Sequence, residues 1–149
     1  MIYHTFMNKN QRRNLIPRIM VVDDEKDILS IIKRGLESDN VFKVDTFSNG
    51  ESALQAFEGH PEYYYDIILT DIRMPKMSGF ELYRRIKEKR SSTKIAFITA
   101  FEINKDEFRK VIPSIHVIDF ISKPVSISNL ITKLKSMLDT YPESTTATL

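Results

Sequence analysis

Four short, mainly apolar runs constrain the fold of this chain more than any other feature of its sequence. Each is four to six residues long and contains β-branched side chains, and the runs cover residues 19–22, 67–70, 95–98 and 117–122. Continuous apolar runs of this length are typical of strands that are buried on both faces of a sheet. The sequence therefore predicts a parallel sheet with helices on its two sides.

Each run ends on a residue type that can handle a phosphoryl group or a metal ion. These residues are, in chain order, Asp23 with Asp24, Asp71, Thr99 and Lys123. In open α/β sheets, ligands bind outside the carboxyl ends of the strands. Three carboxylates, one hydroxyl and one ammonium group are therefore expected to converge on one small site.

Strand-like and helix-like segments alternate along the chain. Apolar residues at helical spacing predict helices near residues 25–38, 50–58, 79–89, 104–112 and 126–139. The strands are expected near residues 18–23, 41–47, 65–70, 94–98 and 116–121. In the first helix, the buried stripe is predicted to consist of Ile28, Ile31, Ile32 and Gly35. Five successive strand–helix units imply an α/β fold with a doubly wound, five-stranded parallel sheet.

The composition is that of one ordinary globular domain. The chain has 149 residues, of which 42% are hydrophobic and 28% charged, and it contains no cysteine. A chain without cysteine has no disulfide framework and no thiolate metal site, which fits a reduced, cytoplasmic setting. No apolar stretch approaches the roughly 18 residues of a membrane span, so no membrane insertion is expected.

Charge is distributed unevenly along the chain. The net charge is +2, but the first 18 residues carry four basic and no acidic side chains, so the remainder is slightly acidic. Such an arm is more often a solvated terminus than a nucleic-acid contact, and no nucleic-acid partner is expected. The predicted organisation is a basic, flexible arm over residues 1–17, one domain over 18–140 and a polar tail over 141–149.

The three aspartates indicate a cation site. Asp23, Asp24 and Asp71 would repel one another if they met without a counter-charge, and such a cluster usually holds a hard divalent cation. Mg²⁺ is the expected cofactor because it takes oxygen ligands and commonly uses one or two carboxylates together with phosphate oxygens. The alternative is that Asp23 or Asp24 caps the helix that begins near residue 25.

The same residues favour phosphoryl transfer. A carboxylate can attack a phosphoryl group and form an aspartyl-phosphate. Because the transition state spreads charge over the equatorial oxygens, catalysis depends mostly on positioning and charge neutralisation. Mg²⁺ would cover one side of the group, the Lys123 ammonium a second and the Thr99 hydroxyl a third. Asp71, Thr99 and Lys123 are therefore the candidate catalytic residues.

Four segments give the chain a resemblance to a known family. They are Val21–Glu25, Asp71–Gly79, Thr99–Ala100 and Phe120–Pro124. In this order and with these separations, they make residues 18–140 resemble the receiver domain of a two-component response regulator, typified by the stand-alone chemotaxis regulator. The resemblance implies a flavodoxin-like sheet with the strand order 2-1-3-4-5.

The resemblance also implies roles for the residues around the cation. Asp71 would be the phospho-acceptor. Asp24 and Asp71 would bind Mg²⁺ directly, Asp23 would act largely through water, and the carbonyl oxygen of Arg73 would be a further ligand. The Lys123–Pro124 peptide bond would be cis, which would aim the lysine into the site.

A conformational switch is implied by two further positions. Thr99 would move towards the phosphoryl group and vacate space for Phe120, with signalling through the surface of the fourth helix, strand 5 and the fifth helix. The same surface is expected to support a homodimer. Arg73 and Phe101 would flank the water that hydrolyses the aspartyl-phosphate. Because neither side chain is a good base for orienting water, the phosphorylated state is expected to be long-lived.

The function implied is a phosphorylation-dependent signalling switch. It would accept its phosphoryl group from a histidine kinase or a phosphotransfer protein and would not turn over external substrates. Its output is expected to be contact with an unidentified protein or onward phosphate transfer, because the nine residues of the polar tail are too few for an effector module. One alternative is a degenerate receiver that acts as a constitutive protein-interaction module.

Other phosphate-handling classes are disfavoured by particular positions. Haloacid dehalogenase-like phosphatases need a second aspartate two residues beyond the nucleophile, and Arg73 occupies that place here. The chain contains neither G-x-x-x-x-G-K-[ST] nor G-x-G-x-x-G, which argues against a nucleotide-dependent kinase or dehydrogenase. Flavodoxin-like cofactor binding is disfavoured because Asp24 and Glu25, after the first strand, would repel a phosphate that lacks a metal.

Overall fold

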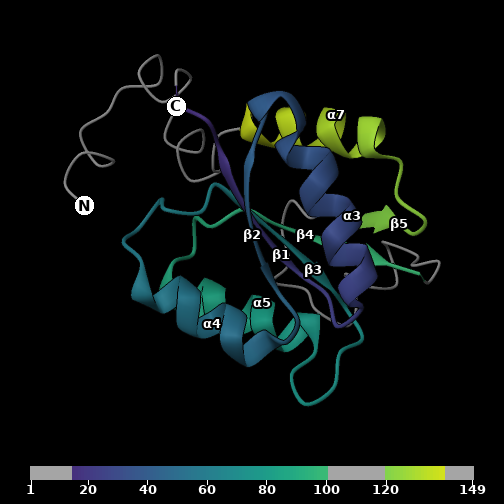
Figure 1. The fold of residues 1–149 in the computed structure, drawn as a ribbon. Helices are drawn as coiled ribbons and strands as arrows, with labels where there is room; N and C mark the ends of the chain where they lie inside the picture. Colours follow the sequence, from purple (N-terminus) through teal and green to yellow (C-terminus); the bar gives the residue numbers. More distant parts are fainter. Residues whose placement is uncertain (1–14, 101–119, 140–149) are drawn as a thin grey trace.

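The computed structural model describes residues 15–100 and 120–139, whose strands form one five-stranded sheet (Figure 1). The strands are β1 (Arg18–Val22), β2 (Lys43–Phe47), β3 (Ile67–Asp71), β4 (Ile95–Thr99) and β5 (Phe120–Ser122). Their order across the sheet is β2-β1-β3-β4-β5, and each neighbouring pair is parallel. The predicted α/β fold with strand order 2-1-3-4-5 is confirmed.

Helices cover both faces of this sheet. One face carries α3 (Lys26–Glu37) and α7 (Ile127–Leu138), and the other carries α4 (Gly50–Gly59) and α5 (Gly79–Lys89) (Figure 1). Side chains alternate between the faces along each strand, so β1 sends Ile19 and Val21 into one core and Met20 and Val22 into the other. The continuous apolar runs of the sequence are therefore explained by burial on both faces.

The buried stripe of α3 differs from the prediction, which included Ile31 and omitted Leu29 and Leu36. Leu29, Ile32 and Leu36 are buried, whereas Ile31 is 55% exposed. Successive residues of a helix are about 100° apart, so Ile31 points away from the face that carries Ile32. The prediction that Ile31 belongs to the core is wrong, while Ile28 packs against the core as a partly buried side chain.

Other element boundaries differ from the predictions by a few residues. A short 3₁₀ helix, η1 (Ser38–Asn40), follows α3, and Asp39 and Asn40 have positive φ angles, so β2 begins at residue 43 and not at 41. The helix predicted over 104–112, the start of the strand predicted over 116–121, most of the basic arm and the polar tail lie outside the described residues. No helix in the described part of the chain has the length and apolarity needed to cross a membrane.

A partly buried polar contact joins β1, β2 and the segment that precedes β3. The Tyr65 hydroxyl donates to Asp45 Oδ2 at 2.8 Å, and Arg18 Nη1 donates to Asp45 Oδ1 at 3.0 Å. Burial raises the pKa of Tyr65 above its ordinary value of 10.0, and the hydrogen bond to Asp45 raises it further. The neutral phenol is therefore the form that the native state favours.

This shift in the Tyr65 pKa predicts a loss of stability in alkali. Because the folded-state pKa is raised, the stabilisation is complete below about pH 10 and is lost as the pH rises towards the folded value. Tyr65→Phe should cost about 1 kcal/mol of unfolding free energy at neutral pH through the lost hydrogen bond. The difference between wild type and variant, measured by urea unfolding, should shrink above pH 10. A constant difference over this range would contradict the assignment.

Candidate functional site

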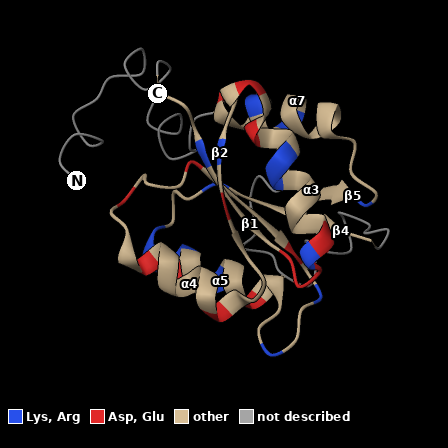
Figure 2. Cartoon of the chain, viewed as in Figure 1, with Lys and Arg blue, Asp and Glu red and all other residues tan. Residues whose placement is uncertain are grey.

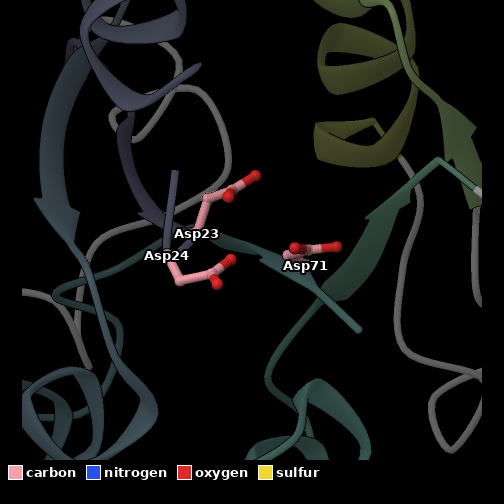
Figure 3. Close-up of side chains that lie close together, drawn as sticks. All are labelled: Asp23, Asp24 and Asp71. Atoms are coloured by element: carbon pink, nitrogen blue, oxygen red, sulfur yellow. The ribbon is translucent and has the colours of Figure 1, made fainter. Parts of the chain in front are cut away.

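The acidic residues meet at the carboxyl ends of β1 and β3. Asp23 and Asp24 directly follow β1, and Asp71 is the last residue of β3. One carboxylate oxygen from each of the three lies within 4.8 Å of the others, and their side chains face a common space (Figure 3). Figure 2 shows the acidic segment where β1 ends and α3 begins. The predicted convergence of these carboxylates is therefore present in the fold.

Asp23 is almost completely buried, and its two oxygens have different surroundings. The backbone N–H of Glu25 donates to Oδ1 at 2.8 Å. Oδ2 accepts no hydrogen bond of acceptable geometry from the described residues, although Lys123 Nζ lies 2.8 Å away as an ion-pair partner. Helix α3 begins after Glu25 without a side-chain cap among the described residues, so the capping alternative for Asp23 and Asp24 is wrong.

Lys123 reaches this cluster from the residue after β5. Its Nζ lies 2.8 Å from Asp23 Oδ2, 3.5 Å from Glu25 Oε1 and 3.6 Å from Asp71 Oδ2. Burial lowers the pKa of Lys123, but the three carboxylates outweigh burial and raise it above its ordinary value. The lysine is therefore held as an ammonium ion, and the peptide bond to Pro124 is cis, as the resemblance implied.

The sequence analysis gave Glu25 no role in the predicted phosphoryl site, although it stands in the first motif. Its side chain is 62% exposed and faces the Lys123 ammonium from the solvent side. The signal available in the sequence was a third acidic residue directly after the Asp23–Asp24 pair. That signal is weak because acidic residues are also common at the start of helices.

The Asp71 carboxylate lies in an environment that disfavours its charge. Burial raises the pKa of Asp71, and the neighbouring Asp23 charge raises it further, while Lys123 and the Ile72 N–H oppose this shift. The Ile72 N–H donates to Asp71 Oδ1 at 2.9 Å, whereas Oδ2 faces Lys123. Asp71 is therefore a buried, partly compensated carboxylate at the end of the central strand.

The loop after β3 fits tightly against Asp71. The Gly79 N–H donates to the Ile72 carbonyl at 2.8 Å, and a Cβ atom at residue 79 would overlap the Asp71 carbonyl oxygen. Ser78 caps α5 by accepting from the Glu81 N–H at 3.2 Å. Helix α5 thus begins at residue 79 as predicted, and the absence of a side chain at Gly79 lets α5 approach the end of β3.

The other predicted site residues occupy distinct places. Thr99 is buried at the end of β4, and its carbonyl accepts from the Lys123 N–H at 2.9 Å. Phe120, at the start of β5, is partly buried, and its ring stacks on that of Phe97 with 5.7 Å between centroids. The Arg73 residue is exposed beyond Asp71, and Phe101 lies outside the described residues.

The donor set fits a hard divalent cation. Three carboxylates within one ligand sphere provide the oxygen atoms that Mg²⁺ prefers. The buried Asp23 Oδ2 has unused acceptor capacity, which a cation or its water could satisfy. A site of this composition can bind a cation and hold an anionic group beside Lys123.

Comparison with known proteins agrees with this geometry. Residues 19–135 match the family model of the response regulator receiver domain. The chain belongs to this family. Response regulator ArlR of Staphylococcus aureus is 31% identical over 127 residues, which cover 85% of this receiver and 54% of that relative. The receiver thus spans about half the length of the curated relatives that it matches.

Solved receiver domains share its fold. A receiver domain protein from Clostridium thermocellum aligns with a TM-score of 0.72 and 27% identity, over 83% of this chain and 95% of that chain. A CheY-like receiver domain protein from Methanospirillum hungatei aligns with a TM-score of 0.71 and 26% identity, over 84% and 95% of the two chains. Family membership makes phosphorylation-dependent switching in two-component signalling the general role of this receiver domain.

Proposed function

We propose that Asp71 of this receiver accepts a phosphoryl group from a histidine kinase or a phosphotransfer protein. The observation that supports this most directly is the position of its carboxylate at the end of the central strand, 3.6 Å from the Lys123 ammonium and beside two further aspartates. A carboxylate in this position can act as a nucleophile towards phosphorus.

In the proposed step, an oxygen of Asp71 forms a bond to phosphorus as the bond from phosphorus to the donor's imidazole nitrogen breaks. The electron pair of the broken bond stays on that nitrogen, and because the donor's other ring nitrogen carries a proton before the step, the donor leaves as neutral histidine. The Lys123 ammonium donates to one phosphoryl oxygen and the Thr99 hydroxyl to another. Both groups reduce the charge that develops on the equatorial oxygens.

Mg²⁺ is the proposed cofactor. Asp24 and Asp71 would bind it directly, Asp23 would bind through water, and the Arg73 carbonyl would complete the protein ligands. When bound, the ion supplies positive charge against the carboxylates and the phosphoryl oxygens. The proposal is supported by the three carboxylates, each of which has an oxygen within 4.8 Å of the others.

Intact mass provides the direct test of the proposed function. The protein should gain the mass of one phosphoryl group when it is incubated with Mg²⁺ and a small acyl-phosphate donor. A protein that never gains this mass, yet binds its target, would instead be a constitutive interaction module. That outcome would contradict the proposal and support the alternative of a degenerate receiver.

A two-state coupling between Thr99 and Phe120 is the proposed switch. Thr99 would move towards the phosphoryl group, and Phe120 would fill the space beside it, giving two discrete packings. Thr99→Ala should therefore weaken the phosphorylation-dependent changes in NMR shifts of β5 and α7 residues. Phe120→Ala should alter these changes while retaining more of the Asp71 labelling than Thr99→Ala does. Unchanged spectral responses in both variants would contradict this route.

The lifetime of the aspartyl-phosphate gives a further prediction. Arg73, a long cation, and Phe101, a bulky apolar ring, stand two residues beyond Asp71 and Thr99. Since neither side chain orients water well, the aspartyl-phosphate should be hydrolysed slowly compared with that of other receiver domains. The double variant Arg73→Asn with Phe101→Glu should lose its phosphoryl group severalfold faster in Mg²⁺. A rate equal to or below that of the wild type would refute this role.

The remaining predictions concern organisation and output. We propose a basic arm over residues 1–17, a receiver over 18–140 and a polar tail over 141–149. Output through protein–protein contact, or onward phosphate transfer, would use the face formed by β5, α7 and the helix predicted over 104–112, and the same face can support a homodimer. The cytoplasmic setting and the absence of a nucleic-acid partner stay predictions.

A further inference from the structure

Strand β2 forms one edge of the sheet. In the described part of the chain it pairs with β1 along one side, and no strand lies along the other. The Lys43 N–H donates to the Pro17 carbonyl on the β1 side, so the alternating backbone directs the polar groups of Val44 and Thr46 outward. An edge of this kind can pair with a strand of another molecule unless something covers it.

Two side chains of α3 cover the backbone of Val44. The Lys33 ammonium donates to the Val44 carbonyl at 2.7 Å, and the Val44 N–H donates to Glu37 Oε2 at 3.2 Å. The other oxygen of Glu37 lies 3.1 Å from Lys33 Nζ, so the two side chains also form an ion pair one helical turn apart. Both outward polar groups of Val44 are therefore occupied within the chain.

We propose that the Lys33–Glu37 pair closes the β2 edge against a second copy of this chain. An antiparallel contact of two β2 strands about a two-fold axis at Asp45 would set Val44 of each copy opposite Thr46 of the other. Residues in such a pair exchange both of their backbone hydrogen bonds. Each of the four bonds in this contact would then use a polar group of Val44, and the ion pair occupies both of those groups.

A second copy is the occupant that this edge fits best. The proposed contact is self-complementary, as a two-fold interface must be. The carboxylate of Asp45, which would meet its equivalent at the axis, is already neutralised by Arg18 at 3.0 Å. The backbone of β2 would thus pair without bringing two uncompensated charges together.

Exchanging the two charged residues tests this proposal. Lys33→Glu with Glu37→Lys keeps the composition, net charge and helical ion pair, but sets an acceptor beside the Val44 carbonyl and a donor beside its N–H. The mass of this variant by light scattering should be twice that of the wild-type protein at the same concentration. The control is Glu81→Arg with Arg85→Glu, which exchanges an equivalent pair on α5, 2.9 Å apart, and should leave the mass unchanged.

Thr46→Pro should reverse the effect in the exchanged variant. Proline removes the outward N–H of Thr46 and is tolerated on edge strands, so the mass should return to the wild-type value. The proposal is overturned if the exchanged variant keeps the wild-type mass, if Thr46→Pro fails to reverse a mass increase, or if the α5 control also associates. Hydrogen exchange tests the same idea without a variant, because the Val44 amide of the wild type should be protected, and an unprotected amide would overturn the proposal.

Discussion

Asp71→Asn should abolish phosphorylation of this receiver. The wild-type protein, treated with Mg²⁺ and a small acyl phosphate, should gain one base-labile phosphoryl mass, and the variant should gain essentially none. The physical reason is that an amide lacks the nucleophilic carboxylate oxygen that would attack phosphorus. Mass spectrometry of the intact chain, followed by a second measurement after mild alkali, provides the readout.

An aspartate away from the cluster provides the matched control. Asp27 is exposed in the first turn of α3, and Asp27→Asn removes the same charge while leaving the candidate acceptor intact. This control should be labelled as fully as the wild type. Persistent full labelling of Asp71→Asn would show that another residue accepts the phosphoryl group, and the assignment of Asp71 would then be wrong.

Asp71→Asn should also stabilise the protein in the absence of metal. The pKa of Asp71 is raised first by burial and then by the Asp23 charge, so the native state favours the protonated carboxyl. The contribution of Asp71 protonation to the free energy of unfolding is complete below the ordinary pKa of 3.8. It is lost as the pH rises through the pKa of the folded state. In EDTA, Asp71→Asn should therefore melt at a higher temperature than the wild type at neutral pH, and the gap should close in acid.

Mg²⁺ should raise the melting temperature of the wild-type protein by several degrees. Ligands that bind the native state stabilise it by mass action, by about 2.7 kcal/mol when their concentration is about 100 times Kd. For a chain of this length, each kcal/mol corresponds to about 2–4 °C. The cation would relieve the repulsion among Asp23, Asp24 and Asp71. We therefore expect the rise in melting temperature to depend on these three residues.

Asp24→Ala should remove most of this Mg²⁺-dependent shift. The variant loses a proposed direct ligand, and its metal-free form should be at least as stable as the wild type because one of three mutually repelling charges is gone. Asp27→Ala is the control and should keep the full shift, with both proteins compared at matched ionic strength. An unchanged shift in Asp24→Ala would locate the cation elsewhere.

Much of the fold and of the site follows from short-range patterns. A run such as Ile67–Leu69 is apolar at successive positions because both faces of its strand are covered, and Thr70 and Asp71 follow it because polar groups are tolerated where a strand ends. The parallel architecture then brings strand ends together, so the convergence of Asp23, Asp24 and Asp71 could be predicted. The strand order came from the resemblance, since periodicity does not determine which strands are neighbours.

The faces of α3 were less predictable. Ile28, Ile31 and Ile32 are chemically equivalent, and their spacing offers no reason to exclude Ile31 from the buried stripe. Its exposure depends on the direction from which the sheet approaches the helix, and the packing of Leu29 and Leu36 sets that direction. Local periodicity therefore predicted a buried face but included Ile31 and omitted Leu29 and Leu36.

The interaction partners of several long polar side chains were determined by the tertiary structure alone. Glu25 meets Lys123 across about 100 residues of sequence, and Lys33 and Glu37 bind a backbone segment that follows α3. These side chains are long and flexible, so each could contact many different partners. The partner that each contacts depends on which strands are adjacent in the sheet. The sequence by itself determined where the strands run and end, because burial acts on every residue of a strand. The partners of these charges were determined by the assembled sheet, because ion pairs and hydrogen bonds depend on distances between elements that no local pattern encodes.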